Sequence, residues 1–277
     1  MLALTIFIGE MSQLDQIRRV AARLTGKSVA RPNGTLSGHA AGLPFEVLLH
    51  RELLNRFRGR AYRHFELLNE VFLNNPECRS ADDRRGLLGP ESLQHLLSRG
   101  DGPNKSWGAN RQFAEKQNDT AETVILPRKG SRVETWRGTC VTLIDVKTKN
   151  RNKNSQPPNI ISARKLVKAC QIAIDHGHRN PFDLVYVGIG WHERNRRLVC
   201  SDTTVVSLFR SDPDNLYINW VAASQIQFHP SELDQSFRLG KLTWCERFVE
   251  SYLRQLNSHI ASLKTEARQL SGFLRSV

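Results

Sequence analysis

Cysteine is scarce in this chain, and no hydrophobic run is long. The cysteines number five, are widely spaced and form no CxxC pair, and His176 and His178 have no cysteine at the close spacing of zinc ligands. A disulfide framework or a structural zinc site would need an even count or close ligand spacing, so we exclude both. Free thiols of this kind are typical of the cytoplasm, where we expect the protein to function. The five are Cys78, Cys140, Cys170, Cys200 and Cys245.

The N-terminal residues carry only a short, mostly apolar run over residues 2–8. This run is too short to span a bilayer, and it lacks the basic residues and the small-residue cleavage site of a secretory signal. Met11 is the second of only two methionines, and an amphipathic pattern follows it. We therefore expect translation to begin at Met11, and we expect no insertion into a membrane.

Acidic residues are also in short supply relative to basic ones. The 277 residues include 27 Asp and Glu against 40 Lys and Arg, a formal charge of +13. The hydrophobic content of 39% is ordinary for a globular protein, which excludes collagen-like and wholly disordered classes. A basic excess favours a polyanionic partner. A membrane surface is a poorer candidate than nucleic acid, because no basic amphipathic helix carries aromatic anchors.

The hydrophobic pattern changes along the chain from helical to alternating and back to helical. Helical spacing predicts helices over residues 12–25, 44–58, 62–74 and 91–98, with Pro44 in the first turn of the second. Alternation predicts strands over residues 121–127, 132–148, 182–191 and 197–206, and an extended pair over 216–229. A further helix is expected from Asn159 or Ser162 to His176, and a last one over residues 243–272. This order predicts an α/β (α+β) fold with a mixed central sheet flanked by helices.

The side chains best suited to chemistry lie between residues 115 and 149. Asp145 and Lys147 are two apart in a predicted strand, so both project from the same face. A predicted turn at residues 129–131 lies near the midpoint of Asp119 and Asp145, so a hairpin would set these carboxylates opposite each other. Paired carboxylates beside a lysine suit Mg²⁺-assisted phosphodiester hydrolysis. We predict Asp119, Asp145 and Lys147 as catalytic, with Asp119, Asp145 and the carbonyl of Val146 as Mg²⁺ ligands.

The context of this trio bears on its interpretation, because charged pairs on strands are common without any catalytic role. Seven cations and no acid lie between residues 147 and 168, which favours a surface that follows phosphates. Within that run, Gln156 and Asn159 are suited to contacts with base edges. Asn159 is equally consistent with an ordinary helix cap, and both alternatives stay open.

Several blocks of this sequence resemble type II restriction endonucleases of the PD-(D/E)xK superfamily, in particular the HincII-like and HindII-like enzymes. They include EKQNDTAE at residues 115–122, LIDVKTKN at 143–150 and PPNIISARKL at 157–166. RPNGTLSGHAAGLPFE at 31–46 and LYINWVAASQIQFHPSELDQSF at 216–237 agree in the same order. The Asp-x-Lys signature is weak, whereas the longer blocks are specific.

The resemblance implies a restriction-endonuclease-like single domain. Its residues 11–110 would form a mainly helical region that embraces DNA, residues 111–235 the catalytic core, and residues 236–277 a C-terminal helix. Asp119 and Asp145 match the family's metal-binding carboxylates, and Lys147 matches its catalytic lysine. Gln156 matches a glutamine that wedges into the DNA stack. The positions that match DNA-contacting residues are Asn159, Tyr217 and Asn219.

The same resemblance implies an activity and partners. Family members are homodimers that cut double-stranded DNA at GTYRAC with Mg²⁺, leaving blunt ends with 5′-phosphates. A cognate methyltransferase is expected in the same restriction–modification system. Two other functions remain open: a repair or recombination endonuclease of the same superfamily, and a non-catalytic DNA-binding protein. The segment between Asp119 and Asp145 looks longer than in the family.

Overall fold

The structure is a computed structural model that describes residues 12–33, 38–63, 96, 121–126, 141–153, 156–177 and 182–276. Its centre is a six-stranded sheet with the strand order β1-β7-β6-β4-β3-β2. β4 and β6 are parallel, and the other neighbouring pairs are antiparallel. The expected mixed sheet is therefore confirmed. The strands are β1 (Ser28–Ala30), β2 (Ala61–Arg63), β3 (Thr123–Ile125), β4 (Val141–Asn150), β6 (Phe182–Arg194) and β7 (Arg197–Ser207).

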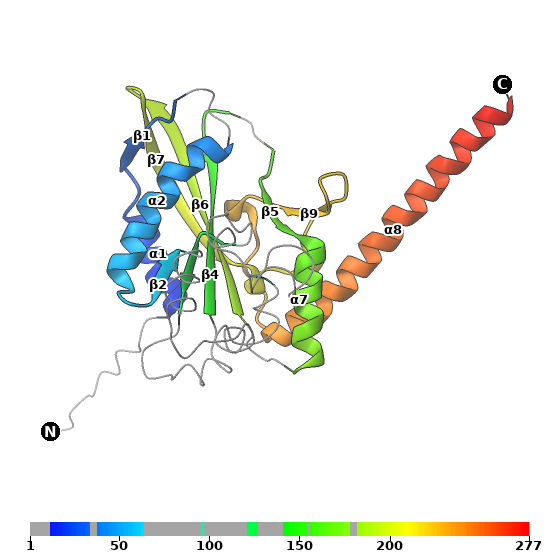
Figure 1. Ribbon diagram of the computed structural model, residues 1–277, viewed down its shortest axis with the longest axis horizontal. Helices are drawn as coiled ribbons and strands as arrows, with labels where there is room; N and C mark the ends of the chain where they lie inside the picture. Colours follow the sequence, from blue (N-terminus) through cyan, green and yellow to red (C-terminus); the bar gives the residue numbers. More distant parts are fainter. Residues whose placement is uncertain are drawn as a thin grey trace, which may run out of the picture.

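Helices cover both faces of this sheet (Figure 1). α1 (Gln13–Ala22) and α2 (Gly38–Arg56) contact β7 and β4 on one side. α7 (Ala163–Asp175), the crossover between parallel β4 and β6, lies on the other side with the first turns of α8 (Lys241–Ser276). Because strand side chains alternate, Leu143 of β4 joins the hydrophobic cluster of α7 while Ile144 joins that of α1 and α2. Asp145 and Lys147 therefore share the α7 face with Leu143.

A second, three-stranded sheet lies beside α7, with the order β5-β9-β8. β5 (Asn159–Ser162) leads directly into α7, whose N-cap is Ser162; the Ser162 hydroxyl accepts a hydrogen bond from the Lys165 N–H. β8 (Ile218–Asn219) and β9 (Gln225–Gln227) form the extended pair expected at residues 216–229. Short 3₁₀ turns at Leu208–Arg210, Pro213–Asn215 and Pro230–Glu232 flank these strands.

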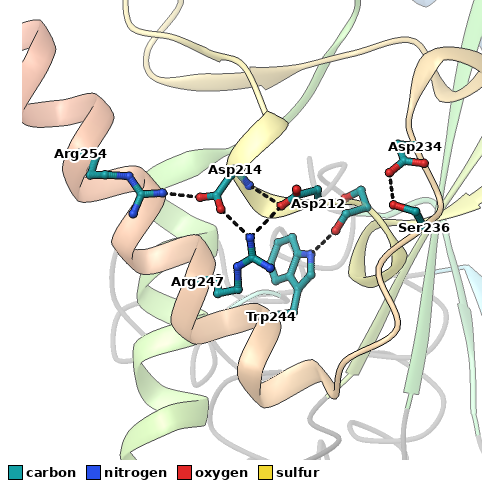
Figure 2. Close-up of polar contacts among 8 residues, drawn as sticks. Asp212, Asp214, Asp234, Ser236, Trp244, Arg247 and Arg254 are labelled. Carbon is teal, nitrogen blue, oxygen red and sulfur yellow. Dashed lines mark hydrogen bonds and ion pairs between the residues drawn. The ribbon is translucent and has the colours of Figure 1, made fainter.

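The long helix α8 packs against the body along its N-terminal half (Figure 1). Figure 2 shows Trp244, whose indole N–H donates to the Ser211 carbonyl at 2.8 Å, and Arg247, whose guanidinium lies 2.7 Å from Asp214. Arg254 also pairs with Asp214. Farther along, the Gln255 Nε2 donates to the Leu216 carbonyl at 3.1 Å, and the ring of Trp220 stacks on His259. After these contacts the helix runs away from the body (Figure 1), and much of the apolar stripe that the sequence predicts along α8 is exposed. Its exposed members include Leu253, Ile260, Leu263 and Leu270.

Some local expectations are wrong. α2 begins at Gly38, six residues before the expected start at Pro44, and continues through Pro44. Ala41 in its early part is fully buried, so packing stabilises this extra helical turn. Residues 62 and 63, the expected start of a helix, instead belong to β2. Asn159 begins a strand and does not cap α7, which excludes that alternative. Apart from residues 62 and 63 and the helical residue 96, the helices expected at 62–74 and 91–98 lie outside the described residues. No helix in the described ranges is long and apolar enough to cross a bilayer.

Candidate active site

The β3–β4 hairpin places a different carboxylate beside Asp145 from the one expected. Thr123 pairs with Ile144, and the Glu122 N–H donates to the Ile144 carbonyl at 3.0 Å. The predicted hairpin paired Asp119 with Asp145, so the register is wrong by three residues. Glu122, immediately before β3, thus lies next to Asp145. Asp119 itself lies outside the described residues, and its predicted role stays a prediction.

The side chains of this hairpin interlock closely. The Glu122 Oε2 accepts a hydrogen bond from the Val146 N–H at 2.9 Å. The Lys147 Nζ lies 2.9 Å from the Asp145 Oδ2, and the side chains of Asp145 and Lys147 are 2% and 19% exposed. Apart from the close contacts with Lys147, Glu122 and the Val146 N–H, neither Asp145 oxygen has a hydrogen-bond partner in the described part of the chain. A buried carboxylate with free lone pairs is costly to maintain, so this group favours a further positive ligand.

The two carboxyl groups perturb each other's ionisation. Burial raises the pKa of Glu122 well above its usual range, and the charge of Asp145 raises it further. Burial also raises the pKa of Asp145, although the nearby Lys147 opposes this effect. For Lys147, burial would lower the pKa, but the charges of Asp145 and Glu122 outweigh burial and raise it. Two carboxyl groups and one ammonium therefore compete for protons in a largely water-free site.

Two further groups surround the pair. Tyr186 of β6 is the register partner of Asp145, and burial together with the carboxylate charges raises the pKa of its phenol, so it remains neutral. Glu46 of α2 adds negative charge that raises the pKa of both Glu122 and Lys147. The described residues contain no cluster of three or more His, Cys, Asp or Glu side chains able to hold a metal, so any ion here would depend on Glu122, Asp145, backbone oxygens and water.

The residues predicted to contact DNA gather mainly on the three-stranded sheet. Asn159 is exposed at the start of β5, Tyr217 is 61% exposed just before β8, and Asn219 is half-buried on β8. The Gln227 N–H donates to the Tyr217 carbonyl, which joins β9 to this group. Gln156 is exposed on the segment that leads into β5. The structure therefore brings Asn159, Tyr217 and Asn219 together on one small sheet.

The cation run is less free than its sequence suggests. Lys147 pairs with Asp145, Lys149 lies 3.4 Å from Glu232, and Arg151 pairs with Asp202. Acids outside the run therefore neutralise part of its positive charge. Arg164 and Lys168 on α7 are exposed. A shallow pocket beside Lys147 includes Lys149 and Arg151 in its lining. The run therefore combines cations that pair with acids and exposed cations, including Lys153 after β4 and Arg164 and Lys168 on α7.

Sequence reasoning missed Glu122 and Gln227. Glu122 and Val124 are two residues apart, so strand alternation would have placed the Glu122 carboxylate on the α7 face with Val124. Alternation alone does not determine which residue of β3 pairs with which residue of β4 across the segment at 127–140. Gln227 stands in the alternating Gln225-Ile226-Gln227, a pattern that predicts two amides on one face of a strand. The side-chain partners of Gln227 are Asn219, 8 residues away, and Asn159, 68 residues away.

Comparison with known proteins identifies the family of this chain. The family model "Restriction endonuclease HincII" matches residues 20–267. The type II restriction enzyme HindII of Haemophilus influenzae is 38% identical over 241 residues, which cover 87% of this chain and 90% of that enzyme. The type II restriction enzyme HincII of Haemophilus influenzae is 37% identical with the same coverage. A solved NlaIV restriction endonuclease aligns with a TM-score of 0.24 at 14% identity, over 42% of this chain and 57% of that one, and supports no argument. The extent of the family match and the identity to both enzymes show that this chain belongs to the HincII restriction endonuclease family.

Proposed function

We propose that the protein is a type II site-specific deoxyribonuclease that cuts double-stranded DNA at GTYRAC. Cleavage at the centre of this palindrome would leave blunt ends with 5′-phosphates. The observation that carries the proposal is the Glu122–Asp145 pair with Lys147 on one sheet face, in a chain of the HincII family. Gln156, Asn159, Tyr217 and Asn219 supply the proposed DNA contacts, and exposed Arg164 and Lys168 would lie near phosphates.

The proposed cofactor is Mg²⁺. Mg²⁺ prefers oxygen ligands and needs only one or two carboxylates, because water and phosphate oxygens complete its shell. The free lone pairs of buried Asp145 and the adjacent Glu122 carboxylate fit this requirement, with the Val146 carbonyl as a further candidate. When bound, the ion would supply Lewis-acid stabilisation of the negative charge that grows on the phosphate. Asp119 remains a predicted ligand, which Asp119→Asn tests.

The chain's own residues would prepare the reaction through their charges. Lys147 keeps its proton on Nζ near neutral pH, because its pKa is raised. It therefore acts as a cation and a hydrogen-bond donor toward the phosphate or the attacking water, and not as a general base. Glu122 and Asp145, whose pKa values are raised, release protons when a cation enters. Cation binding should therefore tighten as the pH rises.

The proposed assembly is a cytoplasmic homodimer of single-domain subunits. A two-fold protein matches the two-fold symmetry of a palindrome, and each subunit would cut one strand. A methyltransferase of the same system would protect host DNA without forming a stable complex. Sedimentation of the protein should give the mass of two chains, and a monomer at micromolar concentration would contradict this part of the proposal.

Incubation with plasmid DNA and Mg²⁺, followed by sequencing of the ends, tests the proposed activity. We expect blunt ends centred on GTYRAC, no cutting in EDTA, and no cutting by Lys147→Ala at equal concentration. Cleavage at DNA junctions or lesions would favour the repair or recombination nuclease instead. Specific binding without any cleavage in Mg²⁺ or Mn²⁺ would favour the non-catalytic DNA-binding protein.

A further inference from the structure

Three side-chain amides form a continuous line across the three-stranded sheet, one from each strand. The Asn219 Nδ2 of β8 donates to the Gln227 Oε1 of β9 at 3.1 Å. The Gln227 Nε2 donates in turn to the Asn159 Oδ1 of β5 at 2.7 Å. Gln227 and Asn159 are also register partners in the β5–β9 ladder. Two of the predicted DNA-contacting residues are thus joined through Gln227, which the sequence did not single out.

The backbone determines the direction of this line. The Asn219 Oδ1 accepts from the N–H groups of Val221 and Ala222, both at 3.1 Å. A backbone N–H can only donate, so the oxygen of this amide must face the turn and its nitrogen must face Gln227. The two ends of an amide are otherwise hard to distinguish, but here the backbone settles the assignment.

The same direction then passes from one amide to the next. Gln227 must turn its oxygen toward the donor of Asn219, which leaves its nitrogen for Asn159. Asn159 must turn its oxygen toward that nitrogen, which leaves its own NH₂ group at the end of the line. Asn159 is exposed, whereas Gln227 and Asn219 are half-buried. The outer end of the line is therefore a hydrogen-bond donor at the surface.

We propose that Gln227 and Asn219 are positioning residues that fix Asn159 as a hydrogen-bond donor toward DNA. This inference rests on the proposed function, because it concerns how that function selects its site. The group that Asn159 contacts must be an acceptor: a purine N7, the guanine O6, the thymine O4 or a phosphate oxygen. The amino groups of adenine and cytosine are donors and do not suit the outer end of the line.

Substitution by a carboxylate reverses the line. In Gln227→Glu, one carboxylate oxygen still accepts from Asn219, but the other has no proton to donate to Asn159. The Asn159 amide then turns its nitrogen inward, toward the carboxylate, and presents its oxygen at the surface. An acceptor on the protein then faces the acceptor on the DNA. Gln225→Glu is the matched control: it adds the same charge on the same strand, and Gln225 takes no part in the line. Asn219→Asp provides a second reversal, because aspartate keeps the contacts to the Val221 and Ala222 N–H groups but cannot donate to Gln227.

The test measures kcat/KM in Mg²⁺ on a GTYRAC duplex and on duplexes carrying one modified acceptor each. Single 7-deazapurines remove N7, 2-aminopurine in place of guanine removes O6, and 5-methyl-2-pyrimidinone in place of thymine removes O4. Single methylphosphonates remove a charged phosphate oxygen. For the wild type we expect kcat/KM to fall at least fivefold when one particular position is modified. In Asn159→Ala that fall should disappear, and the kind of modification shows whether Asn159 contacts a base or a phosphate. We expect Gln227→Glu and Asn219→Asp to lose about tenfold on the parent duplex and to respond less than twofold to that modification, while Gln225→Glu keeps the wild-type response.

The outcomes separate this inference from the proposed function. If the wild type fails to cut DNA at a defined site, both fail together. If the wild type cuts specifically but Gln227→Glu and Asn219→Asp keep its full response to the modified position, only the amide-line inference is overturned. The same holds if no modified position depends on Asn159. A change of fold alone would not remove the response to one acceptor selectively.

Discussion

Replacement of Glu122 by glutamine should make the metal-free protein more stable while nearly abolishing cleavage. The introduced glutamine keeps an oxygen to accept from the Val146 N–H, whose contact with Glu122 measures 2.9 Å, but carries no charge. Two unit charges about 4 Å apart repel by about 4 kcal/mol at an effective dielectric constant of about 20. Lys147 offsets much of this repulsion, so we expect a net stabilisation on the order of 1–2 kcal/mol above neutral pH. For a chain of this size, that raises Tm by about 2–6 °C.

The sign of the pH dependence follows from the raised pKa of Glu122. A carboxyl group whose folded-state pKa lies above its unfolded value contributes stability that is full below the unfolded pKa and is lost as the pH rises through the folded pKa. The wild type in EDTA should therefore lose more stability between about pH 5 and pH 8 than Glu122→Gln does. Thermal unfolding at both pH values measures this difference. Glu246→Gln, an exposed carboxylate on α8, is the control. A Glu122→Gln variant that is less stable than the wild type at pH 8, or equally pH-dependent, would refute the reasoning.

Three other predictions concern the lysine, the basic surface and the thiols. Lys147→Ala should lose at least a hundredfold in cleavage rate but retain DNA affinity within about threefold in a gel-shift assay; substantial cutting would contradict its role. DNA affinity should fall steeply with salt, at about 0.9 log units per log unit of salt for each phosphate contact, and a flat response would contradict the basic surface. Burial raises the pKa of Cys200 to about 11 and that of Cys170 well above its usual range. In native protein near neutral pH, these two thiols and the buried Cys245 should therefore resist a disulfide-exchange reagent; rapid labelling of any of them, located by mass spectrometry, would contradict this.

The predictions that held depended on local spacing. The alternation of apolar residues placed β6 and β7 close to their observed bounds, because strand side chains point to alternate faces regardless of distant contacts. The same parity placed Asp145 and Lys147 on one face. Spacing also predicted the long C-terminal helix, whose apolar stripe is exposed over its outer part.

The predictions that failed depended on contacts between distant segments. The pairing of β3 with β4 depends on the packing of their apolar faces, so the midpoint of the long segment between them gave the wrong register: Glu122, not Asp119, lies next to Asp145. The predicted role of Asp119 stays a prediction. Asn159 precedes a helix in sequence, but pairing with Gln227, 68 residues away, draws it into a strand. Local propensity could not anticipate either partner.

The metal-concentration dependence of single-turnover cleavage tests the central claim most directly, because the claim is that Glu122 and Asp145 together hold the catalytic ion. The substrate is a duplex with one GTYRAC site, and the proteins are the wild type, Glu122→Gln, Asp145→Asn and Asp119→Asn. We predict that Glu122→Gln and Asp145→Asn need at least tenfold more Mg²⁺ for half-maximal rate and lose at least a hundredfold in maximal rate. A Glu122→Gln enzyme with the wild-type Mg²⁺ midpoint and maximal rate would contradict the account.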